Sequence, residues 1–145
     1  MMDKVSTNNI LCKLEVAGLN KKNKSFLFSN FYNYYEEREG IKKFFITSYK
    51  NSPHYVSLIK NDFQIYLDYV SRIDQPDHTI SKFIKLVENF SENELTLNKI
   101  LLKKITLKKK KFYLIVDGLH RTSIFFYRYS LNSLPEKYYE ITNST

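Results

Sequence analysis

Residues 112–121 read Phe112-Tyr-Leu-Ile-Val-Asp-Gly-Leu-His-Arg121. The first five residues, Phe112–Val116, are all apolar, which predicts a buried strand. Asp117-Gly118 predicts a tight turn at the end of this strand, where a glycine permits a positive φ or the close approach of a ligand to the backbone. Leu119-His120-Arg121 is then expected to open a helix whose end is marked by Pro135. The segment therefore predicts a strand, a turn and a helix start in immediate succession.

This strand–turn–helix segment would gather ligand-binding groups at one corner of the molecule. The N–H groups of a helix's first turn have no partners within the helix, and the helix dipole favours an anion beside them. His120 and Arg121 add donors, and the planar guanidinium matches a phosphate. Asp117 could hold a metal ion or accept a proton. The pattern predicts phosphate binding with nearby acid–base chemistry; the alternative is a common Asp-Gly turn with a capping Asp and two surface residues.

The rest of the chain shows strand-like alternation and helical stripes. Alternation from Ile10 to Val16 predicts a half-buried strand within residues 10–17. Apolar residues at helical spacing predict one helix capped by Asp62 and another capped by Thr79 or Ser81. The other expected elements are strands over 26–28, 43–49, 54–59 and 95–106, a helix over 30–40 and a basic turn over 108–111. We expect an α/β (α+β) fold, a small mixed sheet with packed helices.

Composition limits the class of protein. The 145 residues are 43% hydrophobic and 26% charged, as expected for a single globular domain over 1–145. No apolar run reaches about 18 residues, and the first nine residues lack an apolar signal region, so we expect no membrane span and a cytoplasmic protein. One cysteine, Cys12, excludes a disulfide framework and a cysteine-based zinc site.

The net charge of +8 points to an anionic partner, which could be a nucleotide, another phosphorylated ligand or, less favoured, a nucleic acid. The alternative is a surface simply rich in lysine. Lys103, Lys104 and Lys108–Lys111 form the densest basic cluster. This cluster could contact nucleic acid, although a solvated hairpin tip explains it more simply.

Asp117-Gly118-Leu119-His120-Arg121 resembles a loop of the ParB/sulfiredoxin-like superfamily, because it follows an apolar strand, a Ser81–Leu86 helix and an Asn98–Ile105 strand. The resemblance covers about residues 78–130, with the strand over 10–17 added to that core. It implies a small α/β fold that binds a nucleotide on a Gly-x-His-Arg loop.

Departures from the superfamily patterns separate its branches. Leu119 stands where sulfiredoxin has its catalytic cysteine, and the 24 residues after Arg121 are too few for the helix-turn-helix of ParB. The closest pattern is the Asp-Gly-His-His-Arg of free-serine kinases, in which Leu119 replaces the first histidine. The resemblance thus implies a phosphotransferase that uses ATP or ADP with Mg²⁺ on a small hydroxyl-bearing acceptor. The alternative is a non-catalytic nucleotide- or nucleic-acid-binding module.

The resemblance also implies roles for individual residues. The expected nucleotide contacts are Gly118, Leu119, His120, Arg121 and Thr122. Asp117 would position Mg²⁺ or orient His120, and His120 would take part in catalysis. Glu15, the acidic residue of the first strand, would be the base, although alternation also makes it an ordinary outward-facing residue. His54 and Tyr55 would contact the substrate; the alternative is that they are partly buried strand residues.

Overall fold

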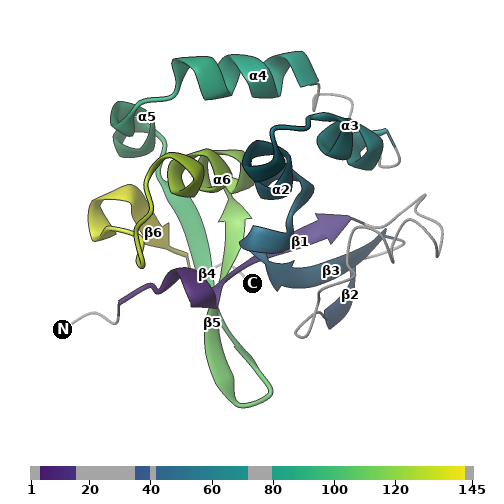
Figure 1. Ribbon diagram of the computed structural model, residues 1–145. Helices are drawn as coiled ribbons and strands as arrows, with labels where there is room; N and C mark the ends of the chain where they lie inside the picture. Colours follow the sequence, from purple (N-terminus) through teal and green to yellow (C-terminus); the bar gives the residue numbers. More distant parts are fainter. Residues whose placement is uncertain (1–3, 16–34, 40–41, 72–79, 143–145) are drawn as a thin grey trace.

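A six-stranded mixed sheet, with helices gathered over one face, organises the chain (Figure 1). The computed structural model describes residues 4–15, 35–39, 42–71 and 80–142. Its strands are β1 (Ile10–Glu15), β2 (Tyr35–Glu39), β3 (Lys42–Ser48), β4 (Ile100–Leu107), β5 (Lys110–Asp117) and β6 (Tyr139–Ile141). The helices are α2 (Pro53–Lys60), α3 (Gln64–Val70), α4 (Ile80–Asn89), α5 (Glu92–Leu97) and α6 (Leu119–Arg128). Short 3₁₀ turns are η1 (Thr7–Asn9), η2 (Tyr49–Asn51) and η3 (Glu136–Tyr138). The expected α/β class is confirmed.

The strand order β2-β3-β1-β5-β4-β6 places β5, which contains the apolar run Phe112–Val116, in the middle of the sheet. β5 runs parallel to β1 and antiparallel to β4, while β6 runs parallel to β4. The carboxyl ends of β1 and β5 therefore meet at one edge of the sheet, and β4 begins at that same edge. Because loops at this edge of a parallel pair commonly carry ligand sites, the topology directs attention to the β5–α6 turn.

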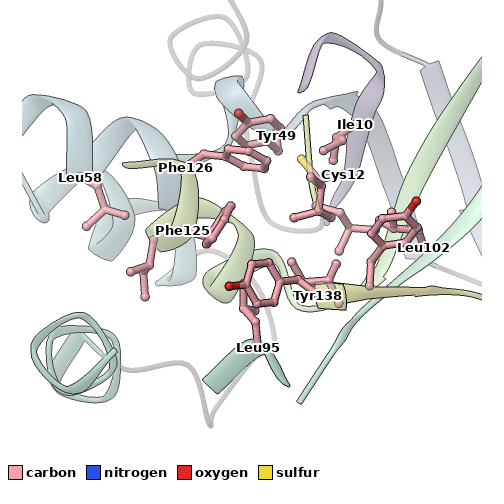
Figure 2. Packing of buried hydrophobic residues seen from close by; sticks show 14 of the residues in the cluster. Ile10, Cys12, Tyr49, Leu58, Leu95, Leu102, Phe125, Phe126 and Tyr138 are labelled. Atoms are coloured by element: carbon pink, nitrogen blue, oxygen red, sulfur yellow. The ribbon is translucent and has the colours of Figure 1, made fainter. Parts of the chain in front are cut away.

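The main core lies between the sheet and the helices α2 and α6. Figure 2 shows Phe125 and Phe126 of α6 pointing toward Tyr49 and the β1 side chains Ile10 and Cys12. The rings of Tyr49 and Phe126 lie 5.2 Å apart between centroids. Burial raises the pKa of the Cys12 thiol well above its usual value. Within the described residues, no helix is long and apolar enough to cross a membrane.

Three expected elements were wrong, and each has a local cause. The strand expected over 54–59 is helix α2, because Ser52 accepts a hydrogen bond from the Tyr55 N–H at 3.1 Å and Pro53 occupies the first helical position. The first part of the strand expected over 95–106 is helix α5, whose acidic first turn suits a helix N-terminus. The helix expected over 30–40 is strand β2 from Tyr35 onward, where pairing with β3 outweighs helix propensity.

Most of the other expected helices and strands lie at the predicted positions. α3, α4, β1, β3 and the apolar strand β5 fall where periodicity placed them. α6 begins at Leu119 as expected, but it ends at Arg128, well before Pro135. The basic turn narrows to Lys108 and Lys109, because Lys110 already belongs to β5. The strand expected over 26–28 and the cap expected at Thr79 lie outside the described residues.

Candidate functional site

The site is built on the turn between β5 and α6. Gly118 has φ +109°, so the expected positive φ is confirmed. Its carbonyl accepts the Thr122 N–H at 2.8 Å and the Thr122 hydroxyl at 2.7 Å, which closes the first turn of α6. A Cβ at position 118 would lie 3.1 Å from Arg121 Nη2 and 3.3 Å from Ile100 Cγ1. The protein's own packing therefore requires this glycine, independently of any ligand.

Arg121 ties this turn to the chain that enters β4. Its guanidinium donates to the main-chain oxygens of Asn98 and Lys99 and to Asp117 Oδ2, the last at 3.0 Å. The Arg121 side chain is only 13% exposed, whereas that of Asp117 is 67% exposed. Asp117 therefore makes an ion pair across one turn of helix and leaves the α6 N-terminus without a side-chain cap. The guanidinium holds the corner together and also borders the cavities described below.

His120 belongs to a compact group that we call the histidine cluster, made of His54, Tyr66, Phe83 and His120. Its members come from α2, α3, α4 and α6, one from each helix. The Tyr66 hydroxyl lies 2.8 Å from His120 Nε2, and burial raises the pKa of Tyr66 to about 12. The His54 and Phe83 rings meet His120 edge to face, with centroids 4.4 and 5.2 Å away. The orientation of His120 is thus set by four packed helices.

Two cavities adjoin the Asp117–Arg121 ion pair. The first, the α4 cavity, has a volume of about 310 Å³, within the range of small-molecule sites. It is lined by Gly118, Leu119 and His120, by Tyr66, Lys82, Phe83, Leu86 and Glu94, and by the ion pair. The second, the β4 cavity, has a volume of about 380 Å³ and is lined by residues 96–99, Leu101, Glu140, Glu94 and the same ion pair. Glu94, Asp117 and Arg121 border both cavities.

Several residues expected at the site meet in the α4 cavity. Gly118, Leu119, His120 and Arg121 line one space together with Asp117. Thr122 instead is fully buried and its hydroxyl donates to the Gly118 carbonyl, so it stabilises the turn and does not line the cavity.

The expected substrate contacts lie elsewhere. His54 is 4% exposed and packs behind His120 as part of the histidine cluster. Tyr55 is half-buried, and its ring meets Tyr49 edge to face at 5.3 Å. Neither residue lines the α4 or β4 cavity, and both belong to helix α2 in place of the expected strand.

Glu15 ends β1 at the expected sheet edge, but it is 4% exposed and lines neither of the two cavities. Its main chain makes a hydrogen bond with Tyr69. Burial raises the pKa of Tyr69, the nearby Cys12 thiol and Glu15 carboxylate raise it further, and the hydrogen bond from Glu15 opposes this. In place of the outward-facing position that alternation allows, Glu15 is enclosed beside α3.

Sequence reasoning missed Lys82, Glu94 and Tyr66 as site residues. The helical spacing of Tyr66 with other apolar residues predicts a core side chain. The position of Lys82 outside the apolar stripe of its helix predicts a solvated side chain. Only the tertiary packing of α3, α4 and α5 against the β5–α6 turn brings them to the cavity.

The described residues hold no group of three or more His, Cys, Asp or Glu side chains arranged to bind a metal. Mg²⁺ usually needs only one or two protein carboxylates in addition to substrate phosphates. Asp117 and Glu94 border the same cavity and meet that requirement. The donor set therefore fits a magnesium ion that arrives with a phosphorylated ligand.

Comparisons with models of protein families, with curated proteins and with solved structures found no match to this chain.

Proposed function

We propose that this protein binds a nucleotide, ATP or ADP, with its phosphates in the α4 cavity, and that it transfers a phosphoryl group to a small hydroxyl-bearing acceptor. The resemblance of the Asp117–Arg121 loop to the ParB/sulfiredoxin-like superfamily, and to its free-serine kinases above all, suggests the reaction. The observation that carries the proposal is the shared cavity, in which Lys82, His120 and Arg121 border one space at the N-terminus of α6.

The chemistry of the α4 cavity suits a phosphate chain. The first-turn N–H groups of α6 have no acceptors within the helix and can donate to phosphate oxygens. Lys82, an exposed residue of α4 that lines the cavity, adds a positive charge. The histidine cluster keeps His120 in one orientation, which lowers the cost of ordering it around a ligand. These groups would orient the phosphates and offset their charge, which is most of what phosphoryl transfer requires.

Carboxylates that border the cavities complete the assignment. Asp117 would hold Mg²⁺, which when bound offsets phosphate charge. The acceptor would occupy the β4 cavity, since the two cavities share Glu94 and the Asp117–Arg121 ion pair. Glu94 borders both spaces, so we assign to it the acceptance of the acceptor's hydroxyl proton in place of the enclosed Glu15.

The position of Glu15 favours a second candidate function, a nucleotide-binding module without turnover. The carboxylate that the resemblance implies as base lies away from both cavities. If Glu94 does not replace it, the protein would bind nucleotide and transfer nothing. Both candidate functions place the nucleotide in the α4 cavity. They differ only in whether an acceptor in the β4 cavity receives a phosphoryl group.

The binding test uses two lysines of the same helix. Lys82 lines the α4 cavity, whereas Lys85, one turn further along α4, is exposed and does not. We expect Lys82→Gln to weaken the affinity for ATP or ADP with Mg²⁺ about five- to tenfold in calorimetry, because a charged contact to phosphate is lost. Lys85→Gln should leave the affinity unchanged. Equal effects of both substitutions, or no nucleotide binding by the wild-type protein, would remove the basis of the proposal.

The turnover test follows phosphate on the acceptor. The wild-type protein, supplied with Mg²⁺ and ATP or ADP, should phosphorylate at least one member of a panel of small alcohols that includes serine. Glu94→Gln should abolish this transfer and keep nucleotide affinity within a few-fold. Tight nucleotide binding with no acceptor phosphorylated would favour the module without turnover.

A further inference from the structure

We infer that the β4–β5 hairpin is a second binding surface, which contacts the phosphate backbone of double-stranded nucleic acid independently of the α4 cavity. The hairpin joins β4 and β5 through Lys108 and Lys109, and it extends away from the helices to form the lowest part of the view in Figure 1. Its end is thus remote from the β5–α6 turn, which lies at the opposite end of β5.

Charge is concentrated on this hairpin to an unusual degree. Residues 95–116 contain seven lysines and neither Asp nor Glu, in a chain whose net charge is +8. Six of these lysines lie in the hairpin, namely Lys103, Lys104 and Lys108–Lys111, and all but Lys103 are exposed. Six of the 23 lysines and arginines therefore lie in this hairpin, in a stretch of 22 residues without an acidic side chain, as expected for a surface that contacts phosphates.

The backbone of the turn gives an independent reason to regard the lysines as functional. Lys108 and Lys109 have φ of 49° and 67°, and Leu107 pairs with Lys110 on either side of them. Two-residue hairpin turns with two positive φ angles strongly prefer Asn-Gly, because other side chains are strained there. This turn holds two lysines in that strained conformation, and strained residues concentrate at functional positions.

The surface around these lysines favours nucleic acid over a membrane. Membrane-surface elements bury apolar side chains among the lipids beside their charges. None of the well-exposed large apolar side chains in the described residues lies between Ile100 and Phe112. The end of the hairpin instead carries five exposed lysines on a narrow two-stranded ribbon, and the major groove of B-form DNA admits such a ribbon. From Lys104 to Lys108 the strand spans roughly 14 Å, enough to reach several phosphates.

The test replaces the strained turn by a relaxed one. The double variant Lys108→Asn with Lys109→Gly removes two charges and introduces the turn sequence that this backbone prefers, so its melting temperature should rise or stay unchanged. Binding to a fluorescent 20-base-pair DNA duplex, measured by anisotropy between 50 and 200 mM KCl, should weaken at least tenfold. The slope of log affinity against log salt should become shallower by about 2, because two phosphate contacts are lost.

A charge-matched control separates the hairpin from net charge. Lys60→Gln with Lys85→Gln removes two exposed lysines from α2 and α4 and should leave duplex affinity within about twofold. If the turn variant unfolds, Lys110→Gln with Lys111→Gln carries the same prediction. Absence of duplex binding by the wild-type protein, equal weakening in the control, or binding to phosphatidylserine vesicles in place of DNA would each overturn the inference. Unchanged ATP or ADP affinity in the turn variant would show that the two surfaces are separate, and a matching loss there would contradict their independence.

Discussion

Replacing Gly118 by alanine should destabilise the whole protein, and the size of the effect can be worked out from the turn. At φ +109° an alanine is strained, which costs about 1–3 kcal/mol. The new Cβ would also lie 3.3 Å from Ile100 Cγ1, a fully buried side chain that would have to shift by a few tenths of an ångström. With about 1 kcal/mol for this crowding, we expect the free energy of unfolding to fall by about 2–4 kcal/mol.

The assay is urea unfolding followed by circular dichroism, together with thermal melting. For a domain of this size, the expected loss lowers the melting temperature by on the order of 10 °C. The second neighbour of the new Cβ is the Arg121 guanidinium at 3.1 Å. In a double-mutant cycle with Arg121→Ala, the two losses should therefore add up to more than the loss in the double variant. A Gly118→Ala variant as stable as the wild type would refute this description of the turn.

Two further predictions concern buried groups. Because the Cys12 thiol is fully buried and burial raises its pKa, it should resist alkylation in the native protein and react at the rate of unfolding; rapid labelling at pH 8, followed by mass spectrometry, would contradict its position. Burial also raises the pKa of Tyr66 to about 12, and that of Tyr49 and Tyr69 further, above the value near 10 in the unfolded chain. The stability that depends on these neutral phenols is complete below pH 10 and is lost as the pH rises through 12. The free energy of unfolding at pH 11 should therefore be a few kcal/mol lower than at pH 9. Equal values at the two pH values would refute this.

The part of the site that the sequence predicts is the part encoded by neighbouring residues. An apolar run, an Asp-Gly pair and the start of a helical stripe are local signals, and β5, the positive φ at Gly118 and α6 follow from them. The apolar stripe of α4 is an equally local signal. Alternation predicts a half-buried β1, whereas Leu11 and Glu15 on its second face are buried as well. At Ser52-Pro53 a local signal was present but was outweighed by the strand-forming residues that follow it.

The rest of the site depends on contacts between distant parts of the chain. The guanidinium of Arg121 is held by the carbonyls of Asn98 and Lys99, which no pattern near position 121 reveals. The histidine cluster needs four helices to pack before Tyr66 can reach His120. Glu15 followed the alternation of its strand in sequence, yet the packing of Tyr69 from α3 encloses it.

The most direct measurement is a titration of ¹⁵N-labelled protein with ATP or ADP and Mg²⁺, followed through backbone amide chemical shifts. We expect the largest shifts at the amides of Leu119, His120 and Arg121, and smaller ones at Lys82, because the phosphates would accept hydrogen bonds from the first turn of α6. Shifts confined to the lysines of the β4–β5 hairpin, or no shifts at millimolar nucleotide, would contradict it.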